Sequence, residues 1–396
     1  MICNIKDVYE YAGSRQKDAL NALVLAQVVD SPGISRKEIT HTNKLRPSSV
    51  SSACQDLLDR GILYEKSIVD PNQRGRPEVA LYATTDYWTS ACIFMESLDF
   101  RAALVDISGK ITPLTIKNEY TTSTNYQDKL NAALSQVIEE KPEKGNFIGI
   151  GLSLPGFGIA QEHTWITSTR FGHLNQISST HFGNSIDVHL NWVRSIDARM
   201  QSLLLSNPEF SKGKTILFHW GYGIGVTLSI DGKLTNDSFS KFGELGHTVV
   251  DHKSEKQCRC GSRGCLETEA AIWALLPSIK KRFDEVPVNE REFSAFLEKR
   301  FIEELPEIEK AIDYINIGLL NISKLFSPDR ILLYGPFTDH DRIYNRVREN
   351  FYQNIPHSEF KSIDISRIQH TPADEVIGST YSLFIDALRK DLTASS

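Results

Sequence analysis

The most constraining feature of the sequence is a short segment, residues 243–267, that brings together three cysteines and a histidine. The four residues are His247, Cys258, Cys260 and Cys265. They supply four ligands, which is the number that a structural zinc site requires. Gly261 and Gly264 would allow the loop to fold back toward the metal. The segment therefore predicts one structural zinc ion per chain, with a set of unrelated buried thiols as the alternative.

The composition is typical of a protein of the reducing cytoplasm. The chain has 396 residues and 6 cysteines, and its first 19 residues are polar and charged, unlike a secretory signal peptide. No window approaches the roughly 20 consecutive apolar residues that a membrane span needs. We therefore expect a cytoplasmic protein of about two to four domains with no membrane partner, in which Cys3, Cys54 and Cys92 are free thiols.

Charge is distributed unevenly along the chain. The net charge is -6, which argues against an affinity of the whole protein for nucleic acid. Residues 1–85, however, hold 11 Lys and Arg against 10 Asp and Glu, a balance of +1 that leaves -7 for the remainder. The acidic excess thus lies outside the amino-terminal segment.

That segment has the pattern of three helices followed by a β-hairpin. Helices are expected at residues 18–30, 35–40 and 47–60, and strands at 62–66 and 78–82. Ser35 and Glu38 match a capping box at the start of the second helix. Pro47 suits the first position of the third helix. The order of elements predicts a winged helix-turn-helix DNA-binding domain over residues 1–85.

The third helix and the wing carry the expected DNA contacts. The polar residues at the start and on the outer face of this helix are Arg46, Ser48, Ser49, Ser52 and Gln55. Such a helix can enter a major groove and bond to phosphates or base edges. The wing tip holds Arg74, Gly75 and Arg76, a narrow probe that suits a minor groove. The alternative is a three-helix interaction module with a solvated hairpin tip.

From Tyr87 onward the pattern is α/β. Strands are expected at residues 90–96, 102–105, 112–117, 147–153, 216–220, 224–230 and 330–334, and helices at 126–139, 267–326 with an interruption near 286–287, and 379–389. Two successive α/β lobes predict a ligand-binding cleft between them. We assign residues 86–197 and 377–396 to the first lobe. Residues 198–376 form the second lobe, with the zinc segment and helices for oligomerisation.

The winged helix, the two lobes and the zinc segment occur in the order found in the ROK (repressor, ORF, kinase) family, which the sequence resembles over nearly its whole length. The most specific elements are residues 243–247 and 258–267, which look like the family signature. The Arg74 to Pro77 wing is similar to that of the sugar-responsive repressors of the family. The resemblance implies an actin-like fold related to sugar kinases, and a homodimer or homotetramer.

The family contains sugar kinases as well as transcription factors, and the resemblance implies that this chain is not an enzyme. Alignment on residues 101–106 puts Phe94 at the Asp of the kinase phosphate loop, Glu96 and Ser97 at its glycines and Leu98 at its Thr. Neither Phe94 nor Leu98 offers a ligand, and a glutamate in this loop would repel a triphosphate.

The kinase catalytic base is also replaced. The family's Asn-Asp pair falls on Arg194 and Ser195, and a serine has no useful basicity at neutral pH. A local shift of register would bring Asp197 to this position. Residues 222–225 keep the glycines of the second phosphate motif, which also serve a tight strand turn. We therefore expect no kinase activity.

By resemblance, Glu244, His247 and Glu267 contact sugar hydroxyls, while His247 binds zinc through its other nitrogen. The alternative is that the two glutamates have local roles in the loop and at a helix start. On the opposite side of the site, Ser195 and Arg194 replace the sugar-binding pair. Arg194 and Arg170 would suit a phosphorylated or acidic sugar, because guanidinium pairs with oxyanions.

These observations predict a sequence-specific transcriptional regulator of carbohydrate-metabolism genes, most simply a repressor. A sugar or sugar phosphate bound between the lobes would change the spacing of paired winged helices on double-stranded DNA. Two alternatives remain: a DNA-binding regulator controlled by a partner protein, and a zinc-containing sugar kinase.

Overall fold

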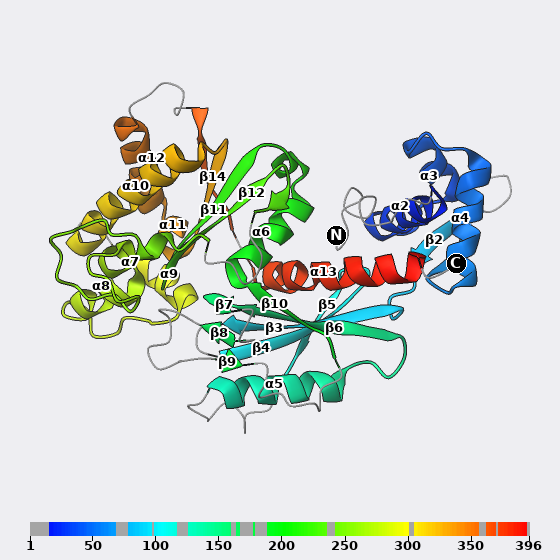
Figure 1. Cartoon of the computed structure of the whole chain (residues 1–396), viewed down its shortest axis with the longest axis horizontal. Coiled ribbons are helices and arrows are strands. Elements are labelled where there is room, and N and C mark those ends of the chain that lie inside the picture. Colours follow the sequence, from blue (N-terminus) through cyan, green and yellow to red (C-terminus); the bar gives the residue numbers. More distant parts are fainter. Residues whose placement is uncertain are drawn as a thin grey trace.

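A long carboxyl-terminal helix joins the amino-terminal helices to a pair of five-stranded sheets in the computed structural model (Figure 1). The structure describes residues 16–68, 78–96, 99–116, 126–159, 164–166, 177–178, 188–235, 242–300, 305–355, 362–369 and 371–393. In this part of the chain, no helix is both long enough and apolar enough to cross a membrane.

The amino-terminal domain has the predicted order of elements. It consists of α2 (Gln16–Asp30), α3 (Arg36–Thr42), α4 (Pro47–Asp59) and the antiparallel strands β1 (Leu63–Ile68) and β2 (Glu78–Ala83). The capping box at α3 is confirmed, because the Ser35 hydroxyl accepts from the Glu38 amide while the Glu38 carboxylate accepts from the Ser35 amide. One face of α4 is buried and includes Val50, Ala53 and Leu57. These helices are consistent with a helix-turn-helix.

The first lobe is a mixed sheet with the strand order β10-β6-β3-β4-β5. Its strands are β3 (Trp88–Glu96), β4 (Asp99–Asp106), β5 (Ile111–Leu114), β6 (Asn146–Leu154) and β10 (Leu190–Arg194). The helix α5 (Tyr126–Glu140) covers one face, and α13 (Pro372–Thr393) covers the other (Figure 1). A small sheet of β7 (Phe157–Ile159), β8 (Thr164–Ile166) and β9 (Ile177–Ser178) follows β6.

The second lobe has the strand order β13-β12-β11-β14-β15. Its strands are β11 (Lys214–Trp220), β12 (Ile224–Ile230), β13 (Lys233–Leu234), β14 (Arg330–Tyr334) and β15 (Asp364–Arg367). The helices are α6 (Ser195–Ser206), α7 (Leu266–Ala270), α8 (Ile272–Ile279), α9 (Glu290–Glu298), α10 (Pro306–Phe326), α11 (Pro336–Asp339) and α12 (Asp341–Asn354), with short 3-10 turns η4 (Pro208–Ser211) and η5 (Leu245–His247).

Two helical boundaries differ from the prediction. The stretch expected as one helix with a single interruption, residues 267–326, is divided into α7, α8, α9 and α10. The first break is at Ala271, whose extended backbone is followed by a hydrogen bond of 3.0 Å from the Ile272 amide to the Gly221 carbonyl. The terminal helix starts at Pro372 rather than at residue 379. Its additional amino-terminal turns reach the region between the two lobes.

Candidate functional site

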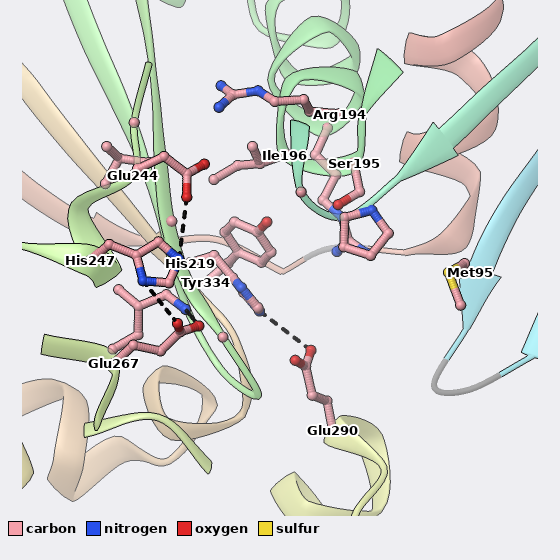
Figure 2. A pocket seen from close by; sticks show the side chains of 18 of the residues that line it. Met95, Arg194, Ser195, Ile196, His219, Glu244, His247, Glu267, Glu290 and Tyr334 are labelled. Atoms are coloured by element: carbon pink, nitrogen blue, oxygen red, sulfur yellow. Dashed lines mark hydrogen bonds and ion pairs between the residues drawn. The ribbon is translucent and has the colours of Figure 1, made fainter. Parts of the chain in front are cut away.

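The candidate site is a cavity between the lobes of about 110 Å³ (Figure 2). Five of the residues expected to bind the effector line it: Arg194, Ser195, Glu244, His247 and Glu267. A second cavity of about 510 Å³ adjoins it, and both are lined by Met95, Arg199, Glu290 and Glu375. The sixth expected residue, Arg170, lies outside the described residues.

His247 stands between this cavity and the cysteines. It ends the turn η5, and its Nε2 lies 3.5 Å from Oε2 of Glu244, as Figure 2 shows. Its Nδ1 lies 3.3 Å from Sγ of Cys258. Burial lowers the pKa of His247, which favours the neutral imidazole that can bind a metal. The ring thus presents one nitrogen to the thiols and the other to the cavity.

The four predicted ligands form one cluster. Their donor atoms all lie within 4.8 Å of one another, and Sγ of Cys260 is 3.7 Å from Sγ of Cys265. Zinc-sulfur distances of about 2.3 Å in a tetrahedron place two sulfurs about 3.8 Å apart, so the donor set fits zinc. Gly264, at φ +67°, brings the loop back, and a Cβ there would lie 1.9 Å from the Asp251 carbonyl oxygen. The cluster could therefore hold a metal ion.

The two expected sugar-contact glutamates have different surroundings. Glu267, in the first turn of α7, is only 2% exposed, and its Oε1 accepts from the Ile224 amide at 3.2 Å. Its Oε2 lies 3.6 Å from Nδ1 of His247. Burial raises the pKa of Glu244, and the neighbouring Arg194 lowers it in part. Both carboxylates can accept hydrogen bonds from ligand hydroxyls.

Arg194 is buried in the cavity wall. Its Nε and Nη2 donate to the two carboxylate oxygens of Asp197 at 2.6 and 2.9 Å, and its Nη1 donates to the Phe242 carbonyl. The guanidinium is therefore bonded on three nitrogens within the protein. Ser195 follows as the first residue of α6 and brings no carboxylate to the cavity. Asp197 does not replace the missing base, because its carboxylate is turned to Arg194.

The turn between β11 and β12 is engaged by two carboxylates. The amide of Tyr222 donates to Oε1 of Glu290 at 2.7 Å, and the amide of Ile224 donates to Glu267. A Cβ at Gly221 would lie 2.7 Å from the same oxygen of Glu290. These amides are the groups that a bound phosphate would need as donors. The amides of this turn are thus bonded to the protein's own carboxylates, and Gly221, directly before residues 222–225, allows the close approach of Glu290.

Sequence reasoning missed several residues of the cleft, namely Arg199, His219, Glu290, Tyr334 and Glu375. Figure 2 shows His219 directed at Glu290, 3.3 Å away. Arg199 pairs with the buried carboxylate of Glu375. These residues come from distant segments, and none belongs to a short motif that would have marked it.

The predicted DNA-contacting helix presents a polar face. Arg46, Ser48, Ser52 and Gln55 are exposed and Ser49 is half-buried, while the amide of Gln55 donates to Asp59. Ser51 was not predicted, although it is exposed and completes an i, i+3, i+4, i+7 stripe with residues 48, 52 and 55. The wing residues Arg74, Gly75 and Arg76 lie outside the described residues.

Comparison with known proteins identifies relatives over most of the chain. The model of the ROK family matches residues 91–381. The DNA-binding transcriptional repressor Mlc of Escherichia coli K12 is 24% identical over 277 residues, which are 67% of this chain and 66% of Mlc. The xylose repressor of Caldicellulosiruptor bescii is 24% identical over 391 residues, covering 92% of this chain and 95% of that protein. The N-acetylglucosamine repressor of Escherichia coli O6:H1 is 24% identical over 346 residues, 82% of each chain.

Solved structures show the same fold. A ROK family transcriptional regulator described as a homolog of the E. coli Mlc protein has a TM-score of 0.71 at 18% identity, covering 99% of this chain and 100% of that chain. A ROK hexokinase from Thermus thermophilus has a TM-score of 0.57 at 17% identity, covering 76% of this chain and 99% of that chain. The fold is therefore the α/β sugar-kinase-like fold, and the sequence relatives named above are repressors rather than kinases.

Proposed function

This chain belongs to the ROK family, and from that premise we propose that it is a DNA-binding transcriptional repressor of carbohydrate-metabolism genes with a sugar effector. Residues 1–85 are the DNA-binding domain, residues 86–197 and 377–396 the first lobe, and residues 198–376 the second lobe. The effector binds in the cavity between the lobes and changes the affinity for operator DNA.

The observation that carries this proposal is the meeting of Glu244, His247 and Glu267 at one cavity on a chain whose amino-terminal helices have an exposed polar stripe. Carboxylate oxygens and an imidazole nitrogen at 3.5 Å from each other suit the hydroxyls of a sugar, which both donate and accept. The kinase alternative lacks support, because the β11–β12 turn donates its amides to Glu290 and Glu267.

The effector we propose is an uncharged sugar. Among the described residues that line the cavity, four carboxylates belong to Glu244, Glu267, Glu290 and Glu375, and two guanidinium groups belong to Arg194 and Arg199. Arg194 is paired with Asp197 and Arg199 with Glu375. A phosphorylated sugar would bring further negative charge to a cavity that has more carboxylates than guanidinium groups. The oxyanion role expected for Arg194 is therefore not supported. Relatives named xylose repressor and N-acetylglucosamine repressor support a sugar as the effector.

His247, Cys258, Cys260 and Cys265 hold one structural zinc ion in this proposal. The ion would fix the orientation and tautomer of His247, so that Nε2 faces the cavity. Because the same loop carries Glu244 before the cluster and Glu267 after it, the ion also sets the separation of the two carboxylates. The cysteines have no contact with the effector themselves.

The operator is contacted by Arg46 at the N-cap of α4, by Ser48, Ser49, Ser52 and Gln55 in α4, and by the wing residues Arg74, Gly75 and Arg76. One winged helix makes few base contacts, so specific binding requires a homodimer or a homotetramer that presents paired domains to two half-sites. A partner protein in place of the sugar is the remaining alternative.

Fluorescence anisotropy of the full chain on DNA from upstream of its own gene tests the proposal. We expect D-xylose, N-acetylglucosamine or D-glucose to shift the DNA affinity at fixed salt. Glu244→Gln should weaken binding of that sugar by about tenfold or more, since a hydrogen bond to a charged group contributes about 1.5–3 kcal/mol. Glu255→Gln, at an exposed position of the same loop, is the matched control. DNA binding indifferent to every sugar would favour the partner protein instead.

A further inference from the structure

A single helix, α13, runs from the cleft between the lobes to the amino-terminal helices (Figure 1). Glu375 in its first turn lines both cavities. Asp391 near its carboxyl end contacts the region of α4. At about 1.5 Å of rise per residue, the two positions are roughly 24 Å apart along one continuous helix.

The cavity end of α13 is held by buried polar contacts to both lobes. Glu375 is 2% exposed, its Oε1 pairs with Arg199 of α6, and its Oε2 accepts from the Ser153 hydroxyl of β6 at 2.7 Å. The adjacent Asp374 accepts from Ser202 of α6 at 3.0 Å. A change of charge or hydrogen bonding in the cleft therefore acts directly on the first turn of this helix.

The next turn leaves no space for α13 to slide over its neighbours. A Cβ at Gly378 would lie 1.7 Å from the carbonyl oxygen of Ala198 in α6. A Cβ at Gly151 in β6 would lie 2.7 Å from the carbonyl oxygen of Ser379. Backbones in such close contact move together, because a closely packed interior transmits displacement rather than absorbing it.

The far end of α13 is joined to the DNA-binding helices. Nη1 of Arg60 donates to the backbone carbonyl of Asp391 at 2.9 Å, while the Asp391 carboxylate accepts from the indole nitrogen of Trp88 in β3 of the first lobe at 3.1 Å. Arg60 is the C-cap of α4 and also pairs with Asp56 within α4 at 3.1 Å. Phe384 of α13 belongs to the same hydrophobic core as residues of α2 and α4.

We propose that α13 couples the cavity to the orientation of α4. Glu375 is the positioning residue at the cavity end, and Asp391 transmits the displacement to Arg60 and Trp88. The coupling rests on the proposed function, because it explains how a sugar between the lobes alters DNA binding by a domain whose described residues do not line the cavity.

The first test separates coupling from binding in the full-length protein. Arg60→Ala, which removes the donor to the backbone carbonyl of Asp391, should keep sugar binding, measured by calorimetry with D-xylose, N-acetylglucosamine and D-glucose, and should keep DNA binding without sugar. In the variant, the ratio of DNA affinities with and without sugar should fall below about twofold. In allosteric proteins this ratio is typically about 5- to 150-fold. Asp391→Asn keeps an acceptor oxygen for Trp88 and should retain the ratio. Asp386→Ala, at an exposed position of the same helix, is the control. An unchanged ratio in Arg60→Ala would overturn the coupling.

The second test needs no effector and remains decisive if no sugar acts on the wild-type protein. Hydrogen exchange of the sugar-free protein should show faster exchange of the α4 amides in Glu375→Gln than in the wild type, although the substitution is at the opposite end of α13. Asp386→Ala should leave the α4 amides unchanged. If Glu375→Gln changes the exchange rates of the cleft amides only, α13 does not couple the two regions, whatever the DNA measurements show.

Discussion

Arg194 and Asp197 form a buried ion pair with two bonds, of 2.6 and 2.9 Å, in the wall of the cavity between the lobes. Each side chain is 4% exposed. The positive charge that the sequence offers to an anionic ligand is thus neutralised by a residue of the same helical turn. In the proposed function, this pairing disfavours an anionic sugar.

Arg194→Ala should destabilise the second lobe rather than act selectively on anionic ligands. The substitution leaves the carboxylate of Asp197 buried without its cation, which costs about 3–5 kcal/mol of unfolding free energy. Urea unfolding of the variant measures the loss. The double variant Arg194→Ala with Asp197→Ala should lose less, because no orphaned charge remains. A fully stable Arg194→Ala protein that binds sugar phosphates more weakly would contradict this interpretation.

Loss of one thiol should release the metal. Cys265 is fully buried, and Cys265→Ser should lower the zinc content, measured by mass spectrometry of the metal, from about one ion per chain to near zero. The melting temperature should fall by at least about 5 °C, because 1 kcal/mol corresponds to about 2–4 °C in a unit of this size. Cys54→Ala, which removes a buried thiol of the amino-terminal domain, should keep the zinc. Full zinc content in Cys265→Ser would show that the cluster is not the site.

The capping box of α3 should contribute stability that depends on pH. Hydrogen bonds from Ser35 hold the pKa of Glu38 below its usual value of 4.5. Because the folded-state pKa is lowered, the contribution is present above about pH 4.5 and is lost as the pH falls through the folded value. Ser35→Ala should therefore destabilise α3 by about 1 kcal/mol at pH 7, and by less as Glu38 is protonated.

Hydrogen exchange of the α3 amides as a function of pH measures this effect. Ser51→Ala is a suitable control, because Ser51 is exposed on α4 and belongs to no capping box. If the difference in α3 stability between the wild type and Ser35→Ala grew toward low pH, this prediction would be contradicted.

The polar stripe of α4 should divide into specific and non-specific contacts. Gln55→Ala should reduce the preference for operator over scrambled DNA by about 1–3 kcal/mol if its amide reads a base edge. Arg46→Ala should weaken binding to operator and scrambled DNA equally, and it should reduce the slope of log affinity against log salt by about one. Anisotropy titrations at several salt concentrations distinguish these outcomes. Lys299→Ala in the second lobe should change neither quantity.

Features set by near neighbours in the chain were predictable. The Ser35 and Glu38 capping box, the strand 224–230 and the cluster of His247 with three cysteines all appear where the sequence indicates. Each depends on spacing within one turn, one strand or one loop, where the geometry of the backbone already brings the side chains together. The prediction of one helix with a single interruption over residues 267–326 was wrong, because its first break involves a residue that is distant in the chain. Its break at Ala271 accompanies a hydrogen bond to the distant Gly221.

The sequence by itself thus determined many of the local elements, the four residues of the His247 cluster and the loss of the kinase motifs. Only the tertiary structure decided the long-range partners: the Arg199 guanidinium with the buried Glu375 carboxylate, the Tyr222 amide with Glu290, and the Asp391 carbonyl with Arg60. Periodicity specifies which face of an element is buried but not which other face it meets. A buried charge is bound by whichever partner that packing supplies, because an unpaired one is costly in a medium of low dielectric.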